Sequence, residues 1–159
     1  MLTESLPEML FASKYCIEFS KDPKIWGGSG CYGYPASLLL LSIVDSIGSH
    51  VYGGGADKRF KILNDPEYFG LGLTPDEVNI IKDKYRDLLS HNSLLATNVE
   101  LFPGSPNDAV LVLLNGRYRL NLVPLYILCV RAVNMLINNP KVLVNSQAIK
   151  NIYKKSKSQ

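Results

Sequence analysis

The sequence is poor in the residues that metalloenzymes and nucleophilic enzymes use. It contains two histidines and three cysteines, and the cysteines match no metal-ligand spacing. It also lacks a Gly-x-Ser-x-Gly elbow, a His-Glu-x-x-His helix and a Walker phosphate loop. These absences argue against zinc enzymes, serine hydrolases and P-loop nucleotidases. We therefore expect neither a metal site nor a cofactor.

Long hydrophobic runs are missing too. The longest apolar segment, Leu122 to Ile137, is interrupted by Pro124, Arg131 and Asn134, and it is too short and too polar for a bilayer. The first ten residues carry acids and a proline where a signal peptide would be basic and then apolar. An odd number of cysteines favours free thiols in a reducing compartment. These features predict a cytoplasmic protein without a membrane partner.

Length and composition indicate one globular domain over residues 1–159. Hydrophobic residues make up 47% of the chain, which is normal for a protein with a real core. The net charge of +3 permits an anionic partner without requiring one. Basic residues gather in a tail from about residue 150, for which a solvated end and a phosphate-binding role both remain open.

Hydrophobic periodicity predicts a mostly helical fold. An Asn115-Gly116 pair between two strand-like runs predicts a β-hairpin over 109–122. Residues 96–108, which precede this hairpin, are expected to be loop. We expect an all-α protein, a four- to five-helix bundle with one small β-hairpin. The expected helices are 5–19, 35–52, 74–91 and 123–139, with a short basic helix in 145–159.

Three features outside the third helix invite functional interpretations. Gly28 to Gly33 has the glycine spacing of dinucleotide-binding loops, but an expected helix precedes it instead of a strand. His50 lies near a helix end, where a cation is favourable for structural reasons alone. Asp45, in an otherwise apolar helix, either lies at the solvent edge or pairs with a base such as Arg131.

The third helix has the clearest start signal. Thr74 suits the N-cap, Pro75 the first helical position and Glu77 the reciprocal capping position. On a straight helix Arg86 and His91 are about 140° apart, with an apolar stripe between them. The two side chains would meet only if the helix end is distorted or if a second copy packs across a twofold axis.

The segment around Tyr85 carries a family resemblance. The sequence YRDLLSH, in which Arg86 is followed by Asp87 and then by His91, resembles the Arg-x4–6-His motif of the HEPN superfamily. Members of that superfamily are helical bundles with the motif on a late helix. The resemblance covers mainly the bundle pattern and the helix from Thr74 to Asn92.

The resemblance implies a metal-independent endoribonuclease. Many HEPN proteins act as homodimers in which the RNA 2′-hydroxyl attacks the adjacent phosphate and leaves a 2′,3′-cyclic phosphate. By this resemblance His91 is the general acid/base, Arg86 holds the scissile phosphate and Asp87 orients one of them. Such proteins are frequent in toxin–antitoxin and defence systems, which suggests an antitoxin-type protein partner.

Other cationic residues extend the expected substrate surface. Lys82 and Tyr85 lie near the motif, and Arg117 and Arg119 fall on one side of an alternating strand. The arginines would contact phosphates, or they would only guard an edge strand.

Two further readings of the motif stay open. One is a non-catalytic HEPN-like module that binds a protein or nucleotide. The other is a purely structural role, in which Arg86 and His91 only complete a helix end.

Overall fold

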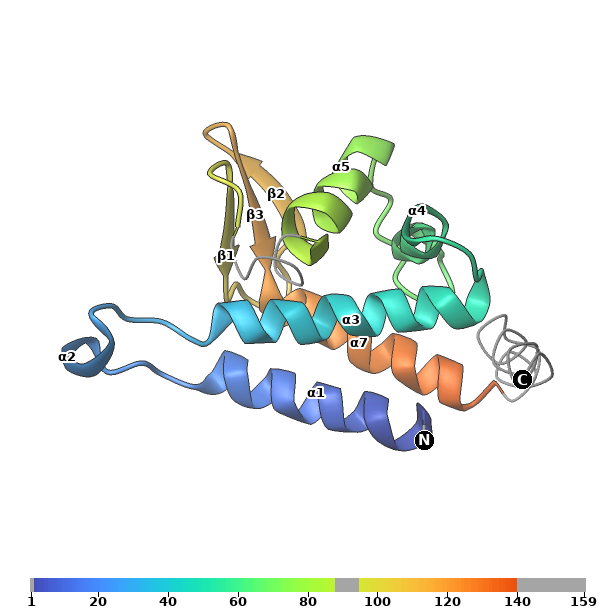
Figure 1. Ribbon diagram of the computed structural model, residues 1–159, viewed down its shortest axis with the longest axis horizontal. Coiled ribbons are helices and arrows are strands. Elements are labelled where there is room, and N and C mark those ends of the chain that lie inside the picture. The colour runs from blue at the N-terminus through green and yellow to red at the C-terminus, as the bar shows by residue number, and fades with distance from the viewer. Residues whose placement is uncertain (1, 88–94, 140–159) are drawn as a thin grey trace, which may run out of the picture.

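The computed structural model describes residues 2–87 and 95–139. The long helices form one layer, and the sheet and the short helices between residues 56 and 87 lie together on one side of it (Figure 1). The helical elements are α1 Leu2–Glu18, α2 Pro23–Trp26, α3 Gly33–Val51, α4 Ala56–Arg59, η1 Phe60–Asn64, α5 Pro75–Asn79, η2 Ile80–Asp87 and α7 Leu122–Ile137. The strands are β1 Val99–Phe102, β2 Leu111–Leu114 and β3 Arg117–Asn121.

Helix α3 is the centre of the fold. It contacts α1 and α7 on one side and α4, η1, η2 and β1 on the other. Its apolar side chains, such as Leu40, Val44 and Ile47, have no exposed surface, as the long apolar run predicted. The predicted helices at 5–19, 35–52 and 123–139 are confirmed, with ends shifted by a few residues.

The prediction of an all-α bundle with a single hairpin is wrong, because the protein contains a three-stranded mixed sheet in the order β1-β3-β2. The hairpin itself is confirmed: β2 pairs antiparallel with β3, and Asn115 and Gly116 have φ angles of 50° and 76°. Strand β1 falls in the expected loop and pairs in parallel with β3. Local periodicity carries no signal for such a distant partner.

The central position of β3 also overturns the edge-strand interpretation of Arg117 and Arg119. Both flanking strands bond to β3, so its charges guard no open edge. The sheet is joined to η2 through the side chain of Tyr85. Its buried hydroxyl lies 3.0 Å from the carbonyl oxygen of Glu100 in β1 and 2.8 Å from that of Tyr118 in β3. A single hydroxyl proton is thus shared between two strands.

The predicted helix at 74–91 begins where expected. Thr74 and Glu77 form the reciprocal capping box. From Ile80 to Asp87 the helix then widens to π-type turns. Uninterrupted π-helix of this length is rare, and π-turns often occur at functional sites. The rest of the predicted helix, with His91, lies outside the described residues, as does the basic segment expected in 145–159.

An arm joins α1 to α3 and carries α2 at its tip (Figure 1). The stack of Phe19 on Tyr32 and the edge contact of Trp26 with Tyr32 order it. The first two glycines of the dinucleotide-like motif, Gly28 and Gly30, belong to this arm and Gly33 begins α3, with helices α1 and α2 before them rather than a strand. The site that such a motif needs is therefore not formed here.

Across the described ranges, no single helix has the length and apolar character to cross a membrane. Only α3 taken together with the segment Ala56–Asn64, which is bent from it by 90°, meets the length and composition criteria.

Candidate functional site

Arg86 lies in a three-residue ion-pair cluster that joins three elements. Its Nη2 donates to Oδ2 of Asp45 on α3 at 2.8 Å. On the other side of the carboxylate, Nε of Arg59 from α4 lies 3.0 Å from Oδ1. The three side chains are mostly buried, with exposed fractions of 24% for Arg86, 14% for Asp45 and 25% for Arg59. One carboxylate thus fixes two guanidinium groups beside each other.

Asp45 therefore pairs with Arg59 and Arg86, and not with Arg131, the base that the sequence suggested. Arg131 donates instead to the carbonyl oxygens of Tyr68 and Phe69. The solvent-edge alternative is wrong as well, since the Asp45 side chain is largely buried.

Asp45 belongs to a polar stripe on an otherwise apolar helix. Five polar residues of α3 recur at spacings of three and four, which places them on one face of the helix. They are Ser42, Asp45, Ser46, Ser49 and His50. The predictions missed this stripe because they assigned Asp45 and His50 separate roles. The spacing itself was visible and would have located the face.

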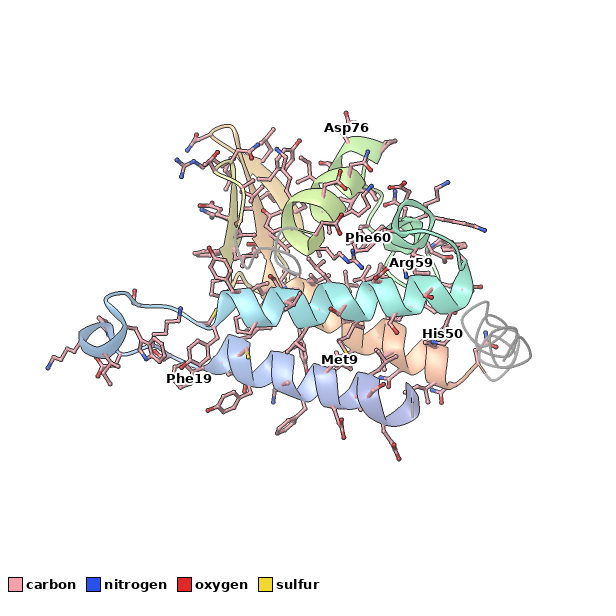
Figure 2. All side chains as sticks on the ribbon, viewed as in Figure 1. Met9, Phe19, His50, Arg59, Phe60 and Asp76 are labelled. Atoms are coloured by element: carbon pink, nitrogen blue, oxygen red, sulfur yellow. The ribbon has the colours of Figure 1, made fainter. Side chains whose placement is uncertain are left out.

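A close backbone approach brings Arg59 to this stripe. A Cβ atom at Gly48 would lie 2.1 Å from the carbonyl oxygen of Arg59, so only glycine fits there. Because Gly48 lies on α3 between Asp45 and His50, α4 packs directly against the polar stripe. Arg59 and His50 are labelled near the C-terminal half of α3 in Figure 2.

The cluster borders a polar pocket of about 350 Å³. Its walls come from α3, from Arg59 and from Arg86; the lining residues are Leu38, Ser42, Asp45, Ser46, Ser49, His50, Arg59 and Arg86. His50 is only 8% exposed. Its Nδ1 has no hydrogen-bond partner among the described residues. Burial lowers the pKa of His50 from its usual 6.5, so the ring is neutral at pH 7.

The guanidinium of Arg86 also bonds to its neighbour in sequence. Its Nη1 donates to Oδ1 of Asp87 at 2.6 Å. The hydrogen bond to Asp87 raises the pKa of Arg86, burial opposes this, and the charge of Asp45 adds to it. Arg86 is thus permanently charged and held by two carboxylates. It retains three of its five N–H donors for other partners.

Two predicted substrate-binding residues near the motif are placed away from this pocket. Tyr85 has no exposed surface and its hydroxyl faces the sheet, so it does not present itself to a ligand. Burial raises the pKa of Tyr85 far above its usual value. Lys82 pairs with Asp57 and, at 3.1 Å, with Asp83.

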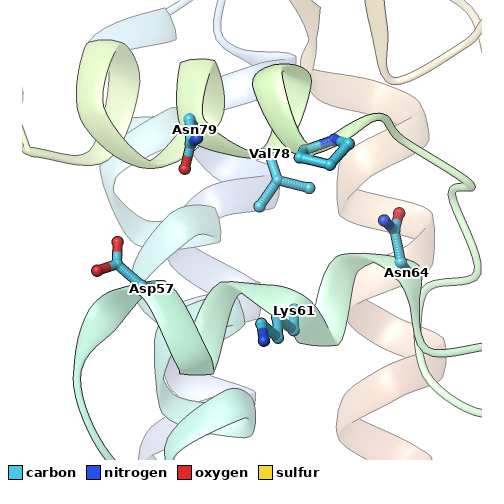
Figure 3. A pocket seen from close by; sticks show the side chains of 6 residues that line it. Asp57, Lys61, Asn64, Val78 and Asn79 are labelled. Atoms are coloured by element: carbon cyan, nitrogen blue, oxygen red, sulfur yellow. The ribbon is translucent and has the colours of Figure 1, made fainter.

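Lys82 and Asp57 lie near a second, separate pocket. It has a volume of about 450 Å³ and lies between the α4–η1 segment and α5 (Figure 3). Its lining residues are Asp57, Lys61, Asn64, Pro75, Val78 and Asn79. Lys82, the predicted substrate-binding residue near this pocket, is already paired with two carboxylates. We therefore assign this pocket no role in substrate binding.

Arg117 and Arg119 line a third pocket, of about 500 Å³, on the sheet. Their common pocket agrees with the expectation that they share one side of β3. Nε of Arg119 lies 2.6 Å from Oε1 of Glu100, and its guanidinium lies over the ring of Phe102 at 4.6 Å. This pocket shares no lining residue with that of Arg86.

Comparison with protein-family models, with curated proteins and with solved structures found no match to this chain.

Proposed function

We propose that the protein is a HEPN-like, homodimeric endoribonuclease that cleaves RNA without a metal ion. The observation that carries the proposal is the position of Arg86 at an open polar pocket, fixed by Asp45 and adjacent to Arg59. A guanidinium held in this way is preorganised to bind a phosphate and to stabilise charge that grows in a transition state.

The charge of the pocket suits a phosphodiester. Arg59 and Arg86 carry two positive charges and Asp45 carries one negative charge, so the lining has an excess of one positive charge. A phosphodiester carries one negative charge. The three N–H groups of Arg86 that bond neither Asp45 nor Asp87 are sufficient for two phosphate oxygens.

The chemistry proposed is in-line attack of the RNA 2′-hydroxyl on the adjacent phosphorus. His91 would accept the hydroxyl proton and return a proton to the leaving 5′-oxygen, which breaks the P–O5′ bond and leaves a 2′,3′-cyclic phosphate. Arg86 would hold the phosphate, and Asp87 would orient Arg86 through their hydrogen bond. In a twofold dimer the His91 of one copy would serve the Arg86 of the other.

The test is cleavage of a labelled RNA in EDTA by the wild type, Arg86→Ala and His91→Ala. Lys24→Gln, a change at an exposed lysine of the arm, serves as the matched cationic control. We expect the wild type and the control to cleave equally and both site variants to lose at least about 100-fold in rate. Equal cleavage by all four proteins of unchanged oligomeric state would refute the proposal.

A second candidate function is a non-catalytic binding module whose partner is an antitoxin-type protein. It is favoured by the two carboxylates, those of Asp45 and Asp87, that already bond the guanidinium of Arg86. RNA retained on the protein but left intact in the same assay would support the module over the nuclease.

A further inference from the structure

The pocket beside Arg86 contains polar atoms that the described residues leave unsatisfied. Among the described residues, four buried side-chain nitrogen or oxygen atoms lack a hydrogen-bond partner, and three of them belong to the lining of this pocket. They are Oδ1 of Asp45, Nδ1 of His50 and Nε of Arg59. Oδ1 and Nε lie 3.0 Å apart as an ion pair but are not aligned for a hydrogen bond. A buried polar atom without a hydrogen bond is costly. The ion pair offsets part of that cost for Oδ1 and Nε, whereas Nδ1 of His50 has no partner among the described residues and points most directly to a ligand.

The chemistry of the three atoms restricts the ligand. The carboxylate oxygen of Asp45 only accepts a hydrogen bond, and Nε–H of Arg59 only donates one. The neutral ring of His50 donates or accepts at Nδ1 according to its tautomer. An anion without protons, such as sulfate, offers acceptors alone and would give Oδ1 of Asp45 no hydrogen bond. Hydroxyl groups both donate and accept, and therefore satisfy all three atoms.

The positive charge of the pocket lining requires that the ligand carry negative charge. Arg86 and Arg59 supply the excess positive charge of the lining, and Ser46 and Ser49 add hydroxyl groups on the same face of α3. A volume of about 350 Å³ lies within the range of small-molecule sites, roughly 300–1,000 Å³. The ligand should therefore join an anionic group to neighbouring hydroxyls.

We propose that this pocket is a ribose-phosphate subsite, in which His50 binds a ribose hydroxyl and Arg59 and Arg86 bind the phosphate. The inference rests on the proposed function in one respect, because the ribose phosphate would belong to a nucleotide of bound RNA. His50 is then a specificity-determining residue, which favours ribose over deoxyribose through its hydrogen bond. Its partner is the 2′-hydroxyl, the group that distinguishes RNA from DNA.

Binding of small probes to the full chain tests this subsite without any cleavage. The probes are ribose 5-phosphate, 2-deoxyribose 5-phosphate and inorganic phosphate, measured by calorimetric titration against the wild type and His50→Phe. Phenylalanine keeps the ring bulk and removes the ring nitrogens. We expect the wild type to bind ribose 5-phosphate about 5- to 10-fold more tightly than the deoxy probe, and His50→Phe to lose that preference.

A second variant keeps the test decisive if His50→Phe fails to fold. Ser49→Ala removes one hydroxyl of the pocket and should weaken ribose 5-phosphate about 2- to 5-fold, while Ser105→Ala, outside the pocket, should not. Equal affinity of the wild type for all three probes, or no binding of any, would overturn the subsite. Tight ribose-phosphate binding by a protein that leaves RNA intact would uphold the subsite and refute only the nuclease.

Discussion

The carboxylate of Asp45 lies 2.8 Å from the guanidinium of Arg86, although 41 residues separate them in the chain. The same carboxylate meets Arg59, so it connects α3, α4 and η2 at one point. This arrangement makes Asp45 both a structural link and the support of the proposed phosphate-binding arginine. The two roles lead to separate predictions.

Removing Asp45 should destabilise the fold. Asp45→Ala leaves two largely buried guanidinium groups without their carboxylate, and we expect a loss of about 1–3 kcal/mol in the free energy of unfolding. Urea unfolding measures it, with the exposed Glu18→Ala as a control that should leave the midpoint nearly unchanged. A double-mutant cycle with Arg86→Ala should be strongly non-additive. Additive effects of the two substitutions would show that the Asp45–Arg86 pair contributes nothing to stability.

Gly48 should tolerate no side chain. In an ordinary helix, Gly→Ala stabilises by about 0.5–1 kcal/mol. Here the new Cβ would lie 2.1 Å from the carbonyl oxygen of Arg59, so we expect Gly48→Ala to destabilise by about 1–3 kcal/mol. The direction in which Gly48→Ala shifts the midpoint of thermal unfolding tests this directly. Gly28→Ala is the control, because nothing lies within 4 Å of its added Cβ.

Tyr85 should matter for stability rather than for substrate contact. Tyr85→Phe removes the hydroxyl that β1 and β3 share, and we expect a loss of about 1 kcal/mol in unfolding free energy. Tyr15→Phe, at a side chain that is 61% exposed, should have no measurable effect. Cleavage per folded molecule should be unchanged in both variants. A large rate loss in Tyr85→Phe at unchanged stability would restore its predicted role in substrate binding.

His50 should make stability depend on pH. Because burial lowers its pKa from 6.5, the unfolded chain takes up this proton at a higher pH than the folded chain does. The stability that the neutral ring contributes is thus fully present above about pH 6.5 and is lost as pH falls below it, toward the folded-state pKa. Urea unfolding between pH 5 and 8 gives the free energy of unfolding at each pH. Its increase with pH should be smaller for His50→Gln than for the wild type. Identical slopes would contradict the burial of a neutral ring.

Local signals in the sequence predicted local structure well. The capping pair Thr74 and Glu77 and the turn Asn115-Gly116 act through neighbouring backbone groups, so short patterns reveal them. Strand β1 was missed because its parallel partner is distant in the chain.

The candidate site was only half predicted for the same reason. Arg86 was selected from its motif, whereas its partners Asp45 and Arg59 come from other elements. The π-type turns from Ile80 to Asp87 have no local sequence mark that the helical periodicity would reveal. The polar stripe of α3 was the one missed feature that the sequence displayed, through its spacing of three and four.

The most direct measurement is the chemical identity of the ends that the wild type makes on a labelled RNA in EDTA, beside the same RNA with 2′-O-methyl groups throughout. We predict 2′,3′-cyclic phosphate ends on the RNA, no cleavage of the methylated strand and no cyclic ends with Arg86→Ala. Cleavage of the methylated strand, cyclic ends that persist in Arg86→Ala, or an RNA left intact by the wild type would contradict it.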